Sequence, residues 1–425
     1  MGYALWPALG ATLSRAGKIG PPTATRPMIR TFLLALCLAL TAPAAWAQPM
    51  VIKVRIGEHP DKTRFVMELS EAPRYRVFAL PDPFRVVIDL PELRWTPGQD
   101  NGSARAKGGL ITAMRFGLFA PGTSRVVLDL SAPALVKRVF VLPPTGIFPY
   151  RLVIDVVPVS RATFLAARAA PKVSDPPLDP AASAVTAPPQ LKADERPTIV
   201  IDPGHGGVDP GSRSLTGVDE KKISLAYARA LKRQLEAGGR FRVILTRDKD
   251  IFLRLRDRFE LAERMAGDLF VSLHANNHNS SKVRGASVYT LTEKASDAEA
   301  EALAAKENKA DIIAGINLSD QTEVVSKILI DLAQRETMNL SREFAIGLVS
   351  ELGKVTKLLG NTHRSAGFLV LKSATVPSIL IEIGYLSNRI EERLLRSENH
   401  RISVSRAIGA AIETYFERQT SLNRS

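Results

Sequence analysis

Cysteine is almost absent from this chain of 425 residues, in which Cys37 is the only one. It lies in an apolar stretch near the N-terminus, so the rest of the chain has no thiol. This absence excludes disulfides and any metal site that needs cysteine ligands. Leu36 stands directly before the cysteine, where a lipoprotein signal needs a small residue, so we do not expect lipidation.

Long apolar runs are also scarce. After residue 47 no segment approaches the ~18 consecutive apolar residues of a membrane span, so we expect no transmembrane segment in the mature chain. The exception begins with basic MIR at residues 28–30 and ends in AWA at residues 45–47, the small-x-small pattern of a cleavage site. We therefore expect residues 1–47 to be an upstream extension and a signal peptide, cleaved on export. The true start can be Met1 or Met28.

Acidic residues are fewer than basic ones, 43 against 57, which gives a formal net charge of +14. Four of the basic residues and no acidic residue lie in residues 1–47, so the mature chain carries +10. A basic exported protein suits a polyanionic surface such as cell wall or anionic lipid. Export argues against nucleic acid as a partner. A solvated basic face without a specific partner is the simpler alternative.

Residues 48–159 show short alternating apolar runs separated by Pro, Gly and Asp, which is typical of strands. The stretch from Thr63, TRFVMELSEAPRYRVFALPDPFRVVIDLP, resembles the stretch from Ser124, SRVVLDLSAPALVKRVFVLPPTGIFPYRLVIDVVP. Two copies of one strand unit predict a small all-β sandwich with internal pseudo-symmetry. No catalytic spacing is present, so the unit is a binding module or a spacer. Residues 160–196 are rich in Ala and Pro and predict a linker.

From residue 197 to about residue 420, strand-like and helical patterns alternate. One helical pattern begins near Ile223 and a second ends at Gly267. Two further helical patterns cover about 323–351 and 400–416. This alternation predicts an α/β domain whose mixed sheet carries helices on both faces. In such domains the chemistry collects at strand ends.

The stretch IDPGHGGVDPG, residues 201–211, places a histidine among glycines at a strand end. A phosphate site is disfavoured because no helix follows directly and no GKS or GKT is present. A metal site is favoured, since His274 ends the strand LFVSLHA in the same way. Glu220 precedes a helix that starts near Ile223, so its carboxylate can turn back towards the sheet edge. Two imidazoles, a carboxylate and one open position form the ligand set of a catalytic zinc. His278 is four residues beyond His274, as a second ligand on a helix would be. The intervening Asn-Asn pair disfavours a helix, so we expect His278 to lie in a surface loop.

Glu382 interrupts the apolar run SILIEIG, where a carboxylate is costly unless it is paired or functional. One interpretation is a buried acid that pairs with an arginine such as Arg364. The favoured interpretation is a general base with a raised pKa at the same sheet edge as His205 and His274.

The segment from Thr292, TEKASDAEAEALAAKENKADIIAGINL, predicts an inserted helix over about 296–318, with Ser296 and Glu299 as a capping box. On a helical wheel one face carries Ala300, Leu303, Glu307, Ala310 and Ala314. Glu307 is therefore an acid within a small, mostly apolar stripe. The alternative is a solvated helix whose acids face water.

IDPGHGGVDPG, the following Glu220, SLHAN and ILIEIGYLSN closely resemble the motifs of the zinc-dependent N-acetylmuramoyl-L-alanine amidases of type 3. The resemblance covers roughly residues 198–415. Residues 48–159 look like the AMIN module that precedes such amidases in the periplasm of Gram-negative bacteria. The order of the two parts is similar to that of periplasmic division amidases.

The resemblance implies one zinc ion held by His205, Glu220 and His274, with Glu382 as catalytic acid and base. The reaction would hydrolyse the amide between N-acetylmuramic acid and L-alanine of peptidoglycan, for septal wall splitting in the periplasm. It also implies that the inserted helix blocks the site through Glu307 until a LytM-type activator or other divisome components withdraw it. Two alternatives are another zinc peptidase acting on stem peptides and a non-catalytic peptidoglycan-binding protein.

Overall fold

The computed structural model describes residues 48–95, 103–104, 109–167, 172–173, 196–316 and 327–422. The expected signal region with Cys37 lies outside these residues, as do most of the expected linker and residues 317–326 of the insertion. The described residues from Gln48 onward belong to one compact unit.

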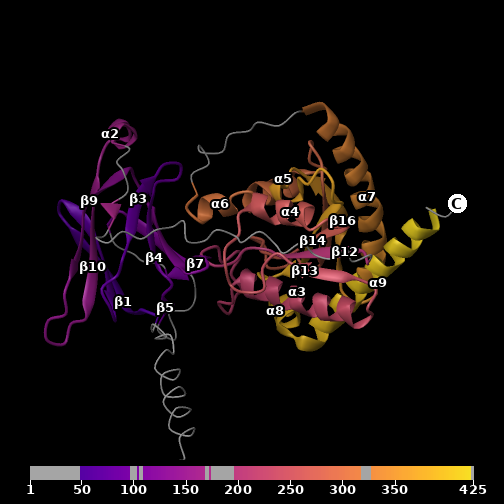
Figure 1. The fold of residues 1–425 in the computed structure, drawn as a ribbon, viewed down its shortest axis with the longest axis horizontal. Helices are drawn as coiled ribbons and strands as arrows, with labels where there is room; N and C mark the ends of the chain where they lie inside the picture. The colour runs from indigo at the N-terminus through magenta and orange to yellow at the C-terminus, as the bar shows by residue number, and fades with distance from the viewer. Residues whose placement is uncertain are drawn as a thin grey trace, which may run out of the picture. The chain divides into compact units, whose positions relative to one another are not determined.

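Two sheets build the N-terminal part, and their strand pairs are antiparallel except for the short parallel pair of β5 and β1 (Figure 1). The first has the order β5-β1-β2-β10-β9 and the second the order β11-β3-β4-β8-β7-β6. Their bounds are β1 Met50–His59, β2 Lys62–Leu69, β3 Arg76–Leu80, β4 Arg85–Pro91, β5 Arg94–Trp95, β6 Ser103–Ala104, β7 Ile111–Ala120, β8 Thr123–Leu130, β9 Ala134–Leu142, β10 Tyr150–Pro158 and β11 Lys172–Val173. Alternate side chains such as Phe65, Ile88 and Val126 meet in a shared core. The expected all-β sandwich is confirmed.

The internal repeat appears as an exchange of strands between the two sheets. Strand β2 of the first copy pairs with β10 of the second, and β4 of the first pairs with β8 of the second. In each pair an arginine and an aspartate form an ion pair at 2.6 Å: Arg64 with Asp155, and Arg125 with Asp89. These four residues occupy equivalent places in the two sequence copies.

Two short elements lie within the range that was expected to be linker. Helix α2, Arg161–Ala166, begins at Ser160, whose side chain accepts a hydrogen bond from Thr163 N. Its buried Phe164 meets Phe84 edge to face, with ring centroids 5.1 Å apart. Strand β11 pairs with β3. Both elements therefore extend the β sandwich beyond residue 159.

The second part is built on a six-stranded sheet of order β13-β12-β14-β17-β15-β16. The strands are β12 Thr198–Pro203, β13 Arg242–Leu245, β14 Leu269–Asn276, β15 Ala286–Leu291, β16 Leu358–Ala366 and β17 Ser378–Tyr385. Strands β13, β12, β14 and β17 are parallel neighbours, whereas β15 runs antiparallel to β17. The expected mixed sheet is confirmed. Strand β12 is apolar almost throughout because both of its faces are covered.

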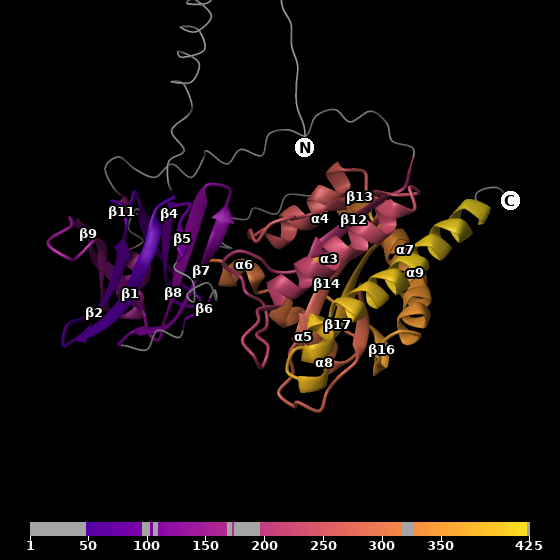
Figure 2. The ribbon, with the colours of Figure 1, turned by 90° about the horizontal axis from the view of Figure 1, so that it is seen from below.

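Helices cover both faces of this sheet (Figures 1 and 2). One face packs against α3 Glu220–Ala237, α7 Lys327–Gly353, α8 Arg389–Arg396 and α9 Glu398–Leu422, and the other against α4 Leu255–Arg264 and α5 Ala298–Glu307. Side chains alternate accordingly, with Ile199 and Ile201 on the first face and Val200 on the second. Helix α9 is longer at both ends than the expected 400–416. None of the helices in the described part of the chain has the length and apolar character that a membrane crossing needs.

The inserted segment is not the single helix that was expected over about 296–318. It forms α5 and a separate short helix α6, Ala310–Ile313, and residues 317–318 lie outside the described part. The chain turns at Asn308, whose side chain donates to Gly367 O and accepts from Leu369 N, both at 2.8 Å. The helix cap is also one residue later than expected, since Asp297 accepts from Ala300 N at 3.0 Å.

Candidate active site

His205 is presented by a strained turn directly after β12. Its φ of 61° lies in the left-handed region, between glycines on both sides. A Cβ at Gly204 would lie 2.3 Å from the His274 ring, so only glycine lets the two imidazoles approach. The turn thus brings together histidines that are 69 residues apart.

Two buried arginines hold this turn through its carbonyl oxygens. Arg258 of α4 donates to Pro203 O at 3.0 Å and to His205 O at 2.9 Å. Arg247 donates to Pro203 O at 3.0 Å and to Gly204 O at 2.8 Å. Arg258 also forms an ion pair with Asp202, at 3.0 Å, in which both side chains are almost fully buried. The ligand-bearing turn is therefore anchored in the core.

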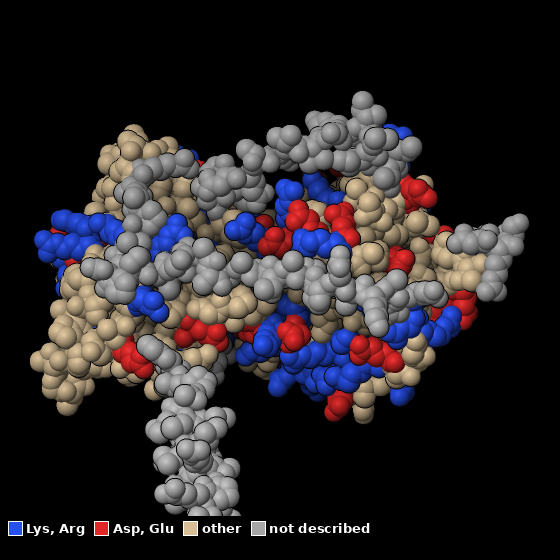
Figure 3. Space-filling model, in the orientation of Figure 1, with Lys and Arg blue, Asp and Glu red and all other residues tan. Residues whose placement is uncertain are grey.

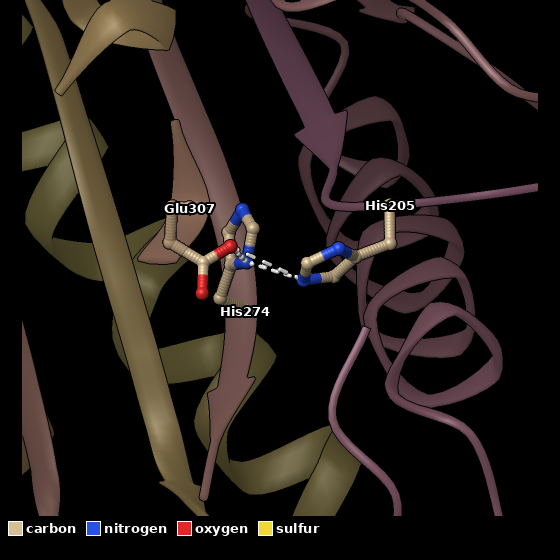
Figure 4. Close-up of side chains that lie close together, drawn as sticks. All are labelled: His205, His274 and Glu307. Carbon is tan, nitrogen blue, oxygen red and sulfur yellow. Dashed lines mark hydrogen bonds and ion pairs between the residues drawn. The ribbon is translucent and has the colours of Figure 1, made fainter. Parts of the chain in front are cut away.

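Three side chains from separate elements converge on one point (Figure 4). His205 Nε2 and His274 Nδ1 lie 3.1 Å apart. Glu307 Oε2, at the end of α5, lies 3.3 Å from His205 Nε2 and 3.4 Å from His274 Nδ1. All three side chains are buried.

Glu220 adds a fourth donor atom from the first turn of α3. Its Oε1 lies 3.0 Å from His205 Nε2 and 3.1 Å from His274 Nδ1. The same oxygen accepts from Ala275 N at 2.9 Å, while Oε2 accepts from Ser212 N at 2.7 Å. The structure thus brings together all three of the predicted metal ligands.

The donor set fits a tetrahedral zinc ion. Bonds of about 2.0–2.2 Å place neighbouring ligand atoms roughly 3.3–3.6 Å apart. The two histidine nitrogens lie 3.1 Å from each other and 3.0–3.4 Å from the two carboxylate oxygens, which is close to that spacing. The other nitrogen of His205, Nδ1, lies 2.8 Å from Asp209 Oδ2, the carboxylate partner that metal-binding histidines usually have.

The charges around the cluster also favour a cation. Burial by itself lowers the pKa of His205, but the nearby carboxylates of Asp209, Glu220 and Glu307 outweigh it and raise that pKa well above its usual value. Burial raises the pKa of Glu220, but His205 and hydrogen bonds lower it well below the usual range. Three buried carboxyl groups thus surround His205, an arrangement that a divalent ion would stabilise.

Glu382 lies on β17 in register with His274 of β14. It is fully buried, and neither carboxylate oxygen has a hydrogen-bond partner among the described residues. Burial raises its pKa well above the usual value, and the charges of Glu220 and Glu307 raise it further. The alternative partner Arg364 pairs instead with Asp297 at 3.3 Å and Glu299 at 2.7 Å.

Glu307 does not face water. The predicted stripe of the insertion is buried, and its members are Ala300, Leu303, Glu307, Ala310 and Ala314. Glu307 Oε1 lies 3.0 Å from Lys306 Nζ, which in turn donates to Ser212 Oγ at 3.0 Å. The cavity beside the cluster has about 240 Å³, less than the ~300–1,000 Å³ of an ordinary ligand pocket. The solvated-helix alternative is therefore wrong.

Several residues of the site were not found from the sequence. Asp209 belongs to the same motif as His205 and could have been assigned from it. Arg247 and Arg258 carry no local signal, because arginines within helical or loop patterns usually face water. Two histidines outside the cluster have other partners. His278 Nδ1 accepts a hydrogen bond from Ser280 N at 2.9 Å, and His400 Nδ1 lies 2.8 Å from the Tyr227 hydroxyl.

A mixed α/β sheet with two histidines and several carboxylates at its carboxyl edge, preceded by a β sandwich, defines a candidate metallohydrolase with an accessory module. Residues 199–414 match the family described as N-acetylmuramoyl-L-alanine amidase, and residues 53–156 match the AMIN domain. The chain belongs to the N-acetylmuramoyl-L-alanine amidase family and hydrolyses cell-wall peptidoglycan.

Two of the similar proteins match this chain over most of their length. The chain is 34% identical over 378 residues to N-acetylmuramoyl-L-alanine amidase AmiC of Neisseria meningitidis serogroup B, covering 87% of this chain and 90% of that protein. It is 32% identical over 404 residues to AmiC of Escherichia coli O6:H1, covering 91% and 94%. The solved catalytic domain of the amidase CwlV from Bacillus (Paenibacillus) polymyxa is 27% identical, with a TM-score of 0.37, and the match covers 52% of this chain and 98% of that one.

Proposed function

We propose that this amidase uses one zinc ion, held by His205, Glu220 and His274, to cleave the amide between N-acetylmuramic acid and L-alanine. The observation that supports the proposal is the convergence of their donor atoms within 3.0–3.1 Å of one another. Zinc bound there would polarise the scissile carbonyl and lower the pKa of an attacking water. Asp209 would keep the His205 ring in the orientation that exposes Nε2.

Glu382 is the proposed acid and base of the reaction. A carboxylate that is buried and without a hydrogen-bond partner is free to exchange a proton with the substrate. Its raised pKa favours proton uptake from the attacking water. Glu382 then passes that proton to the L-alanine nitrogen as the amide bond breaks.

Glu307 is the proposed inhibitory plug. Its Oε2 lies 3.3–3.4 Å from both histidine nitrogens, at the place that a fourth ligand or the substrate needs. The buried stripe of α5 keeps it there. Activation then requires displacement of the insertion, for which a LytM-type activator or other divisome components are the expected partners.

The proposed setting is septal wall splitting in the periplasm, after export through the cleaved signal. Peptidoglycan stems carry carboxylates, and the exposed surface is rich in cationic groups. On the face drawn in Figure 3, Lys and Arg gather over α3 and α8, where Lys222, Arg229, Arg233, Arg393 and Arg396 are exposed. This charge would favour approach to an anionic wall polymer.

The test is product analysis with purified sacculi, using the mature chain and its Glu307→Ala variant, each with and without a chelator. We expect the variant to release peptides that begin with L-alanine at a basal rate about tenfold or more above wild type, and the chelator to abolish release. Peptides cut elsewhere would indicate a zinc peptidase. A folded, zinc-loaded variant that releases nothing would indicate a binding protein, and an unchanged basal rate would refute the plug.

A further inference from the structure

The outer face of the second sheet in the β sandwich is covered, although it carries charged groups. Inward side chains of β4 and β8, such as Ile88 and Val126, lie in the core, so their neighbours in sequence point outward. Among these, Arg85, Asp89 and Arg125 are only 1–6% exposed. Charged side chains are almost never this buried unless something packs over them.

The covering segment is the end of the chain's own insertion. Arg125 forms an ion pair with both oxygens of Asp89, at 2.6 and 2.9 Å, and also donates to Ala314 O at 3.1 Å and Gly315 O at 3.3 Å. Arg85 donates to Ile312 O. These carbonyls lie at the end of α6 and just beyond it, and Ile312 O also accepts from Gly315 N at 2.9 Å.

Apolar contacts continue the same interface. Ala314 and Ile316 are buried against Val127 of β8, together with Val208 and Phe252 of the amidase domain. At the neighbouring strand, Phe252 N donates to Leu118 O at 3.1 Å. The β sandwich, the insertion and the loops beside the metal ligands thus share one packed contact.

The metal-ligand turn itself reaches this interface. A Cβ at Gly117 of β7 would lie 2.3 Å from the backbone carbon of Gly207, two residues after His205. Both positions therefore need glycine for the strand to approach the turn.

The internal repeat supplies a comparison within the same domain. Arg64 and Asp155 of the first sheet match Arg125 and Asp89 of the second, and each arginine lies over an equivalent phenylalanine, Phe140 or Phe78, at 5.9 and 5.8 Å. The Arg64 side chain is 34% exposed, whereas that of Arg125 is 7% exposed. The arginine of this motif is thus partly exposed on one sheet and covered by the insertion on the other.

We propose that the Arg85–Arg125 face of the β sandwich is an intramolecular docking site for residues 312–316, and that this contact locks Glu307 against the metal ligands. The proposal rests on the proposed role of Glu307 as plug. Only four residues separate Glu307 from Ile312, and among them Asp311 accepts from Leu255 N at 3.0 Å. With both ends of α6 held, Glu307 cannot leave unless this contact opens or the short connection deforms.

This contact, called the lock below, is tested in the full mature chain with one variant on the β sandwich and one on the insertion. Arg125→Ala removes the donors, and Gly315→Ala leaves the sandwich unchanged but places a Cβ 2.9 Å from Val87 at a φ of +74°. Arg64→Ala removes the equivalent ion pair on the first sheet and is the matched control. Two quantities are measured: amide hydrogen exchange of residues 307–316, and hydrolysis of a soluble muramoyl peptide, which avoids effects of wall attachment.

We expect amide exchange of residues 307–316 to become about tenfold or more faster in both variants, because hydrogen bonds to a charged group are lost or strained. We also expect both variants to have a higher basal activity than wild type, as Glu307→Ala should have. Arg64→Ala should match wild type in both measurements. If Glu307→Ala is activated but neither Arg125→Ala nor Gly315→Ala is, the lock is wrong and the plug stands. If Glu307→Ala itself is not activated, the plug is wrong, and the lock is refuted with it.

Discussion

At the scale of single residues, the environment of Glu382 leads to the most specific prediction. It is a fully buried carboxylate with no hydrogen-bond partner among the described residues. Burying such a group destabilises the fold, so its presence is a reason to expect a function. It lies in register with His274 on the neighbouring strand, where the proposed catalytic role would account for it.

Replacing Glu382 with Gln in a Glu307→Ala background should lower kcat by about 10²–10⁴, the usual contribution of a general acid or base. Zinc content should remain one ion per chain, because Glu382 is not a proposed ligand. The measurement is kcat on a soluble muramoyl peptide alongside metal analysis. His274→Ala is the contrasting variant, which should lose both metal and activity; a Glu382→Gln enzyme with unchanged kcat would exclude the assigned role.

The residue scale is also where sequence reasoning worked best. The sequence predicted His205 and His274 from strand ends, Glu220 from its place before a helix and Glu382 from its apolar surroundings. The structure gathers these side chains at one edge of the sheet. Ligand chemistry is a property of residue type, so a motif can reveal it. Arg258 was missed because its burial depends on Asp202, 56 residues away in sequence.

At the scale of elements, helix α5 shows how a local signal can be misplaced by one residue. The pattern favoured Ser296 as the N-cap, yet Asp297 accepts the Ala300 N–H. Ser296 Oγ instead accepts from Ser365 N at 3.1 Å on β16. A tertiary contact thus takes the residue that local preference assigns to the cap.

Asp297→Ala should lower the free energy of unfolding by about 0.5–2 kcal/mol, the usual cost of a lost N-cap. It should also speed amide exchange in the first turn of α5. Ser296→Ala is the matched variant and should leave that turn's exchange close to wild type. Urea unfolding and hydrogen exchange check both; faster exchange in Ser296→Ala than in Asp297→Ala would return the cap to Ser296.

At the scale of the whole molecule, ion pairs with a buried aspartate link strands from distant parts of the sequence. Arg64 and Asp155 connect the two repeats of the β sandwich, 91 residues apart. The hydrogen bond from Arg64 lowers the pKa of Asp155 below its ordinary 3.8, although burial opposes this. The pair therefore contributes stability above that pH and loses it as the pH falls below 3.8.

The free energy of unfolding should differ most between wild type and Asp155→Asn at neutral pH, and this difference should shrink as the pH falls below about 4. Trp95 is the only tryptophan after residue 47, and it stacks on Phe116 within the sandwich. Its fluorescence during urea unfolding of the mature chain reports this part directly. A difference that stays constant from neutral pH to pH 3 would contradict the assigned linkage.

The sequence by itself determined the two-part architecture, the mixed α/β sheet and the chemical character of the site, because periodicity and ligand type are local properties. It could indicate that Glu307 lies in an apolar stripe, since that follows from helical spacing. Only the tertiary structure decided that Glu307 faces the two histidines and that the insertion breaks at Asn308. It alone placed Arg125 at the carbonyls of Ala314 and Gly315, because a contact across 189 residues depends on how the whole chain packs.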